Sequence, residues 1–74
     1  MNNQSLISIQ VRRMNDLEEA LECVMPQDDQ RLKEVYIKNQ KAVESSNITM
    51  MRQCVNSMLS LLAKVKRERM SHVS

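Results

Sequence analysis

Apolar side chains recur at helical spacing along the first third of the chain. They stand three or four residues apart from Ile7 to Val24, and polar residues occupy most positions between them. This period matches one face of an α-helix. Asn3 or Ser5 can cap the first turn, and Pro26 disfavours helical angles in the residue before it. The pattern predicts a helix that starts near residue 3 or 5 and ends before the proline.

The second segment opens with the acidic turn Gln27-Asp28-Asp29, which is typical of a helix start because carboxylates complement the positive end of the helix dipole. The apolar stripe that follows is weak because polar Asn39 interrupts it. A polar patch at residues 44–47 comes next, but it contains neither glycine nor proline. Residues 28–69 are therefore predicted either as one long helix or as two helices.

The third segment is the most apolar, and residues 47–70 hold four of the seven methionines. Apolar positions there form two adjacent rows, which together make an arc wider than a two-helix contact requires. Methionine is flexible and adaptable, so it suits either a small helical core or a surface that receives other helices. The width of the arc favours a partner-binding surface for some of these apolar residues.

Composition sets the fold class. The chain of 74 residues has no glycine and one proline, and helix-forming residues dominate it. Tight strand hairpins usually need glycine at positive backbone angles, so we expect an all-α fold. We favour an antiparallel helical hairpin with a long or broken second arm, and a three-helix bundle is the close alternative. Residues 1–74 form one small domain, with disorder expected at about 1–4 and 70–74.

The charge is divided between the two parts of the chain. Residues 1–30 carry a net charge of −4 and residues 31–74 carry +6. This division favours a fold-back of the chain or a head-to-tail approach of two copies. A chain this short supplies little core of its own, and residues 50–65 carry more apolar surface than one helix contact covers, so we also expect self-association through this arc when no partner is bound.

The candidate protein-binding residues lie mainly in the methionine-rich segment. We expect three of them, Val55, Met58 and Leu62, to pack as core against the first helix. We expect Met50, Met51 and Leu61 to form an interface instead, with Tyr36 as an anchor. The full candidate set is Tyr36, Met50, Met51, Cys54, Val55, Met58, Leu61 and Leu62.

A second candidate site is the basic end of the chain, formed by Lys64, Lys66, Arg67 and Arg69. It is a candidate nucleic-acid contact. The plainer interpretation is a solvated helix end whose cations complement the helix dipole. Glu68 dilutes the charge and no aromatic side chain lies nearby for base stacking, so nucleic acid is the weaker of the two functional hypotheses.

The sequence contains no recognisable catalytic motif. No glycine-rich loop is present, and His72 is the single histidine, so we expect neither an enzyme nor a bound metal or cofactor. The chain has no long apolar run that would cross a membrane and no signal peptide, which predicts a cytoplasmic protein. Cys23 and Cys54 are expected as small buried hydrophobes, although a hairpin would also let them pair.

Residues 29–62 resemble the small helical YscE-like co-chaperones of type III secretion needle subunits. The resemblance lies in the acid-rich turn, Tyr36 early in the second arm, the step Ala42-Val43-Glu44 and the apolar run that follows. It implies a cytoplasmic helical hairpin that pairs with a tetratricopeptide-like chaperone to hold a secreted subunit. Pro26 in the turn and the polar residues 44–47 depart from the family pattern. The leading hypothesis is therefore a small adaptor or chaperone subunit that binds protein through helix packing.

Overall fold

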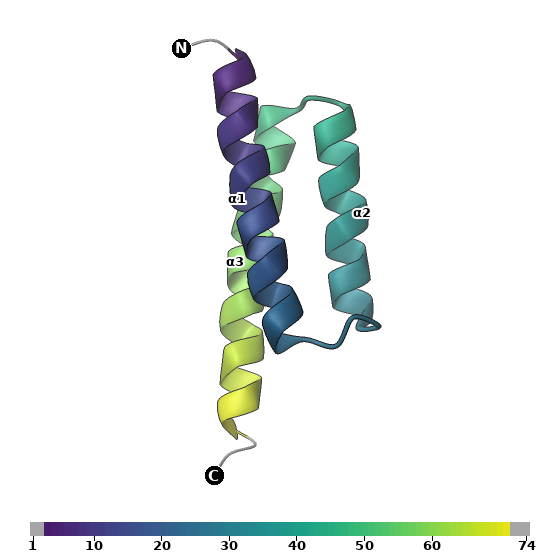
Figure 1. The fold of residues 1–74 in the computed structure, drawn as a ribbon, viewed down its shortest axis with the longest axis vertical. Helices are drawn as coiled ribbons and strands as arrows, with labels where there is room; N and C mark the ends of the chain where they lie inside the picture. Colours follow the sequence, from purple (N-terminus) through teal and green to yellow (C-terminus); the bar gives the residue numbers. More distant parts are fainter. Residues whose placement is uncertain (1–2, 72–74) are drawn as a thin grey trace.

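The computed structural model describes residues 3–71 and consists of three helices in that part of the chain. Helix α1 spans Asn3–Val24, α2 spans Gln30–Glu44 and α3 spans Ile48–Ser71. The chain runs down α1, up α2 and down α3, so α1 and α3 are parallel and α2 is antiparallel to both (Figure 1). The all-α prediction is confirmed. Of the two arrangements considered, the three-helix bundle is correct, and the hairpin with a long or broken second arm is wrong because α2 and α3 fold back on each other.

Helix α1 ends where the proline predicts. The N–H of Met25 still donates to the carbonyl of Leu21 at 2.9 Å, and the chain then leaves the helix at Pro26. A turn follows in which the N–H of Asp29 donates to the carbonyl of Pro26 at 3.1 Å. Asp29 next caps α2, because its Oδ1 accepts from the N–H of Arg31 at 2.9 Å.

The reversal between α2 and α3 explains why no continuous helix forms over residues 28–69. Ser46 has a φ of +52°, in the left-handed region, and the N–H of Asn47 reaches back to the carbonyl of Ala42 at 3.2 Å. The N–H of Ser46 also donates to the carbonyl of Val43 at 3.1 Å. These two bonds form a Schellman motif, which ends a helix. The Oδ1 of Asn47 then accepts from the N–H of Met50 at 3.0 Å, so one residue closes α2 and caps α3.

The core lies along the shared axis of the bundle and takes side chains from all three helices. Methionine supplies much of its volume, since the chain has no phenylalanine or tryptophan. The buried apolar side chains are Met14, Leu21, Met25, Leu32, Ala42, Met51, Cys54, Val55, Met58 and Val65.

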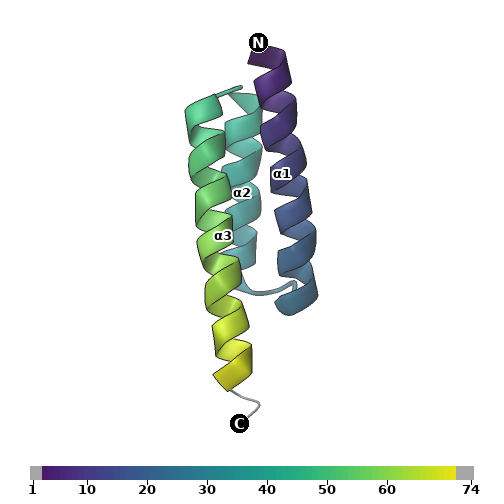
Figure 2. The ribbon, with the colours of Figure 1, turned by 90° about the vertical axis from the view of Figure 1, so that its left-hand side faces the viewer.

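The bundle is elongated, with extents of 48 × 22 × 16 Å. Its two ends differ, because α3 continues beyond the ends of its neighbours at the C-terminal end (Figures 1 and 2). The sequence predicts disorder at about residues 1–4 and 70–74. Residues 3–4 and 70–71 are helical, whereas residues 1–2 and 72–74, which include His72, lie outside the described residues. No helix in residues 3–71 has the combined length and apolar character that crossing a membrane requires.

Candidate protein-binding groove

A groove of about 390 Å³ opens between α1 and α2. It exists because each of these helices packs more extensively against α3 than against the other. We call it the α1/α2 groove. Its lining residues are Val11, Met14, Asn15, Glu18, Tyr36, Asn39, Gln40, Val43 and Glu44.

Asn39 is a buried polar residue in this groove, and its side chain is only 4% exposed. Its Nδ2 donates to Oε1 of Glu18 on α1 at 2.8 Å and lies 3.3 Å from the sulfur of Met58 on α3. Its Oδ1 is buried and accepts no hydrogen bond from any residue of the described chain. A buried carbonyl without a donor is unfavourable by about 1–3 kcal/mol. Asn39 lines both this groove and the one between α2 and α3, so a donor that reached its Oδ1 would offset that cost.

Tyr36 and Glu22 join the two walls of the groove at one end. The tyrosine hydroxyl donates to Oε1 of Glu22, so α2 is tied to α1 there. Partial burial of the ring, together with the neighbouring Glu22 carboxylate, raises the pKa of Tyr36 to about 12. The hydroxyl thus stays protonated at neutral pH and remains a donor.

The rest of the groove combines apolar side chains with polar Asn15 and Gln40 and two acidic residues. Val11 is half-buried, and Val43 on the facing helix is 41% exposed. The charged side chains that line the groove, Glu18 and Glu44, are both acidic. The groove therefore offers apolar contact, a buried acceptor and negative charge, which suits an amphipathic segment that carries cations.

The structure separates the predicted protein-binding residues instead of bringing them onto one surface. Met51, Cys54, Val55 and Met58 are buried, and Met50, Leu61 and Leu62 are half-buried. The assignment of Met51 to an interface is wrong, because Met51 is 0% exposed and belongs to the core. Tyr36 lines the α1/α2 groove, whereas Leu61 lines a different groove between α2 and α3.

Sequence reasoning missed Asn39 and Val43 as site residues. The signal for Asn39 was present, since it is the polar residue that interrupts the apolar stripe of α2. A polar residue within an apolar stripe is expected to need a partner when it is buried. The pattern alone indicates only a weak helix face there, although Asn39 lines both the α1/α2 groove and the groove between α2 and α3.

The two cysteines do not pair. Cys23 is an exposed free thiol and Cys54 is a buried one, so the expectation that both are buried is wrong for Cys23. Burial raises the pKa of the Cys54 thiol. Cys54 therefore behaves as a small core residue and not as a reactive thiol.

The basic end of α3 is exposed at Lys64, Lys66, Arg67 and Arg69. At about 100° per residue these four positions are distributed around the helix and do not share one face. Nucleic-acid binding favours cations clustered on one surface, so this arrangement does not strengthen that alternative.

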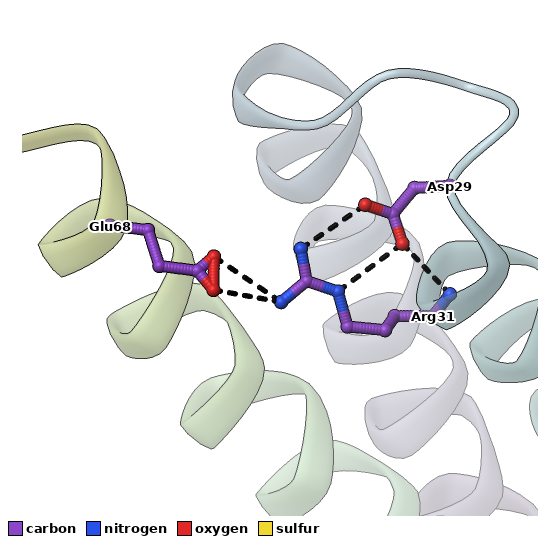
Figure 3. A network of polar contacts seen from close by, with 3 residues as sticks. All are labelled: Asp29, Arg31 and Glu68. Atoms are coloured by element: carbon purple, nitrogen blue, oxygen red, sulfur yellow. Dashed lines mark hydrogen bonds and ion pairs between the residues drawn. The ribbon is translucent and has the colours of Figure 1, made fainter. Parts of the chain in front are cut away.

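Glu68, in the middle of this basic run, is held by Arg31 on α2. The Nη1 of Arg31 lies 3.0 Å from Oε1 of Glu68, and its Nη2 lies 3.1 Å from Oδ2 of Asp29 (Figure 3). The hydrogen bonds from Arg31 keep the pKa of Asp29 below its ordinary value. This network ties the start of α2 to the last turns of α3 and orients the basic end.

Within residues 3–71 no group of three or more potential metal ligands lies close enough together to hold an ion. Comparison with protein-family models, curated proteins and solved structures gives no match to this chain, so the α1/α2 groove is identified from its geometry alone.

Proposed function

We propose that this chain is a small protein-binding adaptor or chaperone subunit that receives an amphipathic helix of a partner in the α1/α2 groove. The observation that supports this proposal is the α1/α2 groove itself, which has exposed Val43 on one wall and is lined by the buried Asn39, whose Oδ1 has no donor in the described chain. Native chains rarely leave a buried carbonyl without a donor. A partner side chain that donates to it would offset that cost only in the complex.

The chemistry of the groove restricts the class of partner segment that could bind there. Val11 and Val43 offer apolar contacts from opposite walls, and Glu18 and Glu44 place negative charge at the edges. Helices that bind in such grooves insert residues spaced three or four apart, and oppositely charged edges set their orientation. We therefore propose a partner helix with one apolar face flanked by lysine or arginine.

The resemblance to needle co-chaperones supports a more specific form of the proposal. In that form the chain acts in the cytoplasm, with a tetratricopeptide-like chaperone as its partner and a secreted subunit as the shared cargo. Tyr36 and Val43 belong to the features that carry the resemblance, and both line the α1/α2 groove. These two residues are therefore the ones to test first.

The test is site-specific photo-cross-linking in cells of the native source. A photo-reactive amino acid at Val43 lies in the wall of the groove, and the same amino acid at Ile37, which is 53% exposed on α2 but does not line the groove, is the matched control. We expect one discrete protein adduct from position 43 and none from position 37. Equal labelling from both positions, or none from either, would reject the groove as the binding site.

A second variant pair checks the same proposal without a probe. Val43→Arg places a cation in the groove and should abolish co-purification of the cross-linked partner, whereas Ile37→Arg should not. Helical content measured by circular dichroism should be the same for both.

A mobility-shift titration with short DNA and RNA tests the alternative function, nucleic-acid binding. Salt-sensitive binding that disappears when Lys64, Lys66, Arg67 and Arg69 become alanine would favour a nucleic-acid regulator.

A further inference from the structure

Helix α1 carries a second stripe on the side turned away from the core. Its positions are separated by three and four residues in alternation, which is the heptad spacing of helices that pack along one seam. Ile9 in this stripe is an exposed large apolar residue. The stripe consists of Leu6, Ile9, Arg13, Asp16, Ala20 and Cys23.

Helix α3 carries a matching stripe, whose positions are also separated by three and four residues in alternation. Leu59 and Met70 within it are 50% and 74% exposed. Its members are Arg52, Asn56, Leu59, Ala63, Lys66 and Met70.

The two stripes lie beside each other on one face of the bundle. Helices α1 and α3 are parallel neighbours (Figures 1 and 2). A groove of about 390 Å³ between them is lined by Arg13 and Arg52 from the two stripes, and by Gln10 and Val55 at its floor. We call this surface the α1/α3 face. It holds three of the five exposed large apolar residues of the described chain.

We propose that a second copy of this chain packs on the α1/α3 face in antiparallel orientation, with the two-fold axis between Arg13 and Asp16. Within residues 3–71 neither of these side chains forms an ion pair or a side-chain hydrogen bond. The antiparallel arrangement places Arg13 of each copy opposite Asp16 of the other. Symmetry then creates the ion pair twice.

The apolar positions fit the same register. The two-fold axis that places Arg13 opposite Asp16 also places Ile9 opposite Ala20 of the second copy, so a large side chain packs against a small one. On α3 the corresponding axis pairs Leu59 with Ala63 of the second copy in the same large-to-small way. Such alternation lets facing layers interdigitate.

One axis can serve both helices. Gln10 and Val55 line the same groove, so they lie at about the same level along the bundle. The midpoint between Arg13 and Asp16 is then level with about residue 59 or 60 of α3, within one helical turn of the midpoint between Leu59 and Ala63. A parallel α1–α1 contact would instead place Arg13 opposite Arg13 and Asp16 opposite Asp16, so charge favours the antiparallel form.

The test uses charge reversal and mixing. We expect wild type to sediment at high micromolar concentration in low-salt buffer with twice the 8.6 kDa chain mass. Arg13→Asp places two carboxylates together, and Asp16→Arg places two guanidiniums together, so each variant alone should dimerise about tenfold more weakly or worse. An equimolar mixture of the two variants should restore dimers. In the mixed pair, one contact joins the two substituted side chains and the other joins the native Asp16 and Arg13, so each contact again brings a carboxylate to a guanidinium.

Lys41→Asp is the matched control, since Lys41 is exposed on α2 away from the α1/α3 face and the change in charge equals that of Arg13→Asp. It should leave dimerisation unchanged. A monomeric wild type, single variants that remain dimeric, or a mixture that remains monomeric would each overturn the proposal. Circular dichroism of each variant checks that the helices persist.

This inference does not depend on the proposed function. Arg13→Asp should retain the Val43 cross-link, and Val43→Arg should retain the dimer. Loss of one property without the other thus identifies which of the two surfaces has been misassigned.

Discussion

The backbone N–H of Asn47 donates to the carbonyl of Ala42 at 3.2 Å, and this bond turns the chain from α2 into α3. It requires Ser46, between them in sequence, to adopt a φ of +52°. Left-handed angles are costly for residues with a Cβ, and glycine normally occupies this position. The chain contains no glycine, so the reversal is made at some cost in stability.

Ser46→Gly should therefore stabilise the protein. Glycine adopts the left-handed conformation without the Cβ clash, and we expect the free energy of unfolding to rise by about 0.5–1 kcal/mol. Ser45→Gly is the contrasting variant and should destabilise, because Ser45 has a φ of −86° and its hydroxyl donates to the carbonyls of Lys41 and Ala42, so glycine there removes both bonds and adds entropy to the unfolded chain. Urea denaturation followed by circular dichroism would measure both. A destabilised Ser46→Gly variant would mean that the serine contributes something other than its backbone angle.

Met51 and Met58 should behave alike as core residues. Their side chains are 0% and 1% exposed, so truncation to alanine should lower the free energy of unfolding by about 2–5 kcal/mol. A domain of this size has little stability in reserve, and either variant should be largely unfolded at elevated temperature. Gln53→Ala, at an exposed position of the same helix outside the α1/α3 face, should change the stability by less than about 0.5 kcal/mol. If Met51→Ala melted like wild type, Met51 would not be part of the core.

Asn39→Leu should weaken partner binding without lowering the stability of the fold. Leucine has a similar volume and removes the buried unpartnered carbonyl, although Glu18 loses one hydrogen bond. We expect the free energy of unfolding to stay constant or rise by up to about 1 kcal/mol, while the partner adduct at position 43 weakens. A large loss of stability in thermal melts would show that the amide is needed for folding and would remove it from the binding site.

Tyr36 should make stability depend on pH in the alkaline range. Its pKa is about 12 in the folded chain, against an ordinary value of about 10 in the unfolded chain. The folded state therefore holds this proton more tightly, so the contribution is complete below about pH 10 and is lost as the pH rises to about 12. Melting temperatures across this range should fall more steeply for wild type than for Tyr36→Phe. Parallel curves would show that the hydroxyl titrates normally.

The sequence by itself determined the all-α class, the end of α1 and the start of α2. Pro26 stops α1 because it disfavours helical angles before it, and Asp29 starts α2 because its carboxylate satisfies a free N–H. These interactions are local, so they can be predicted from neighbouring residues. Helical periodicity likewise identified the apolar stripe of α1 that reaches the core.

Only the tertiary structure decided which neighbour covers each face. Periodicity shows that Met51 and Met58 share a side of α3, but not that the bundle buries both of them completely. The reversal at Ser46 also escaped prediction, because a serine with a positive φ has no distinctive sequence signal. That turn converts a hairpin into a bundle of three helices, and it thereby creates both the α1/α2 groove and the α1/α3 face. Local residues determine where helices begin and end, whereas the competition among apolar faces for burial determines how they assemble.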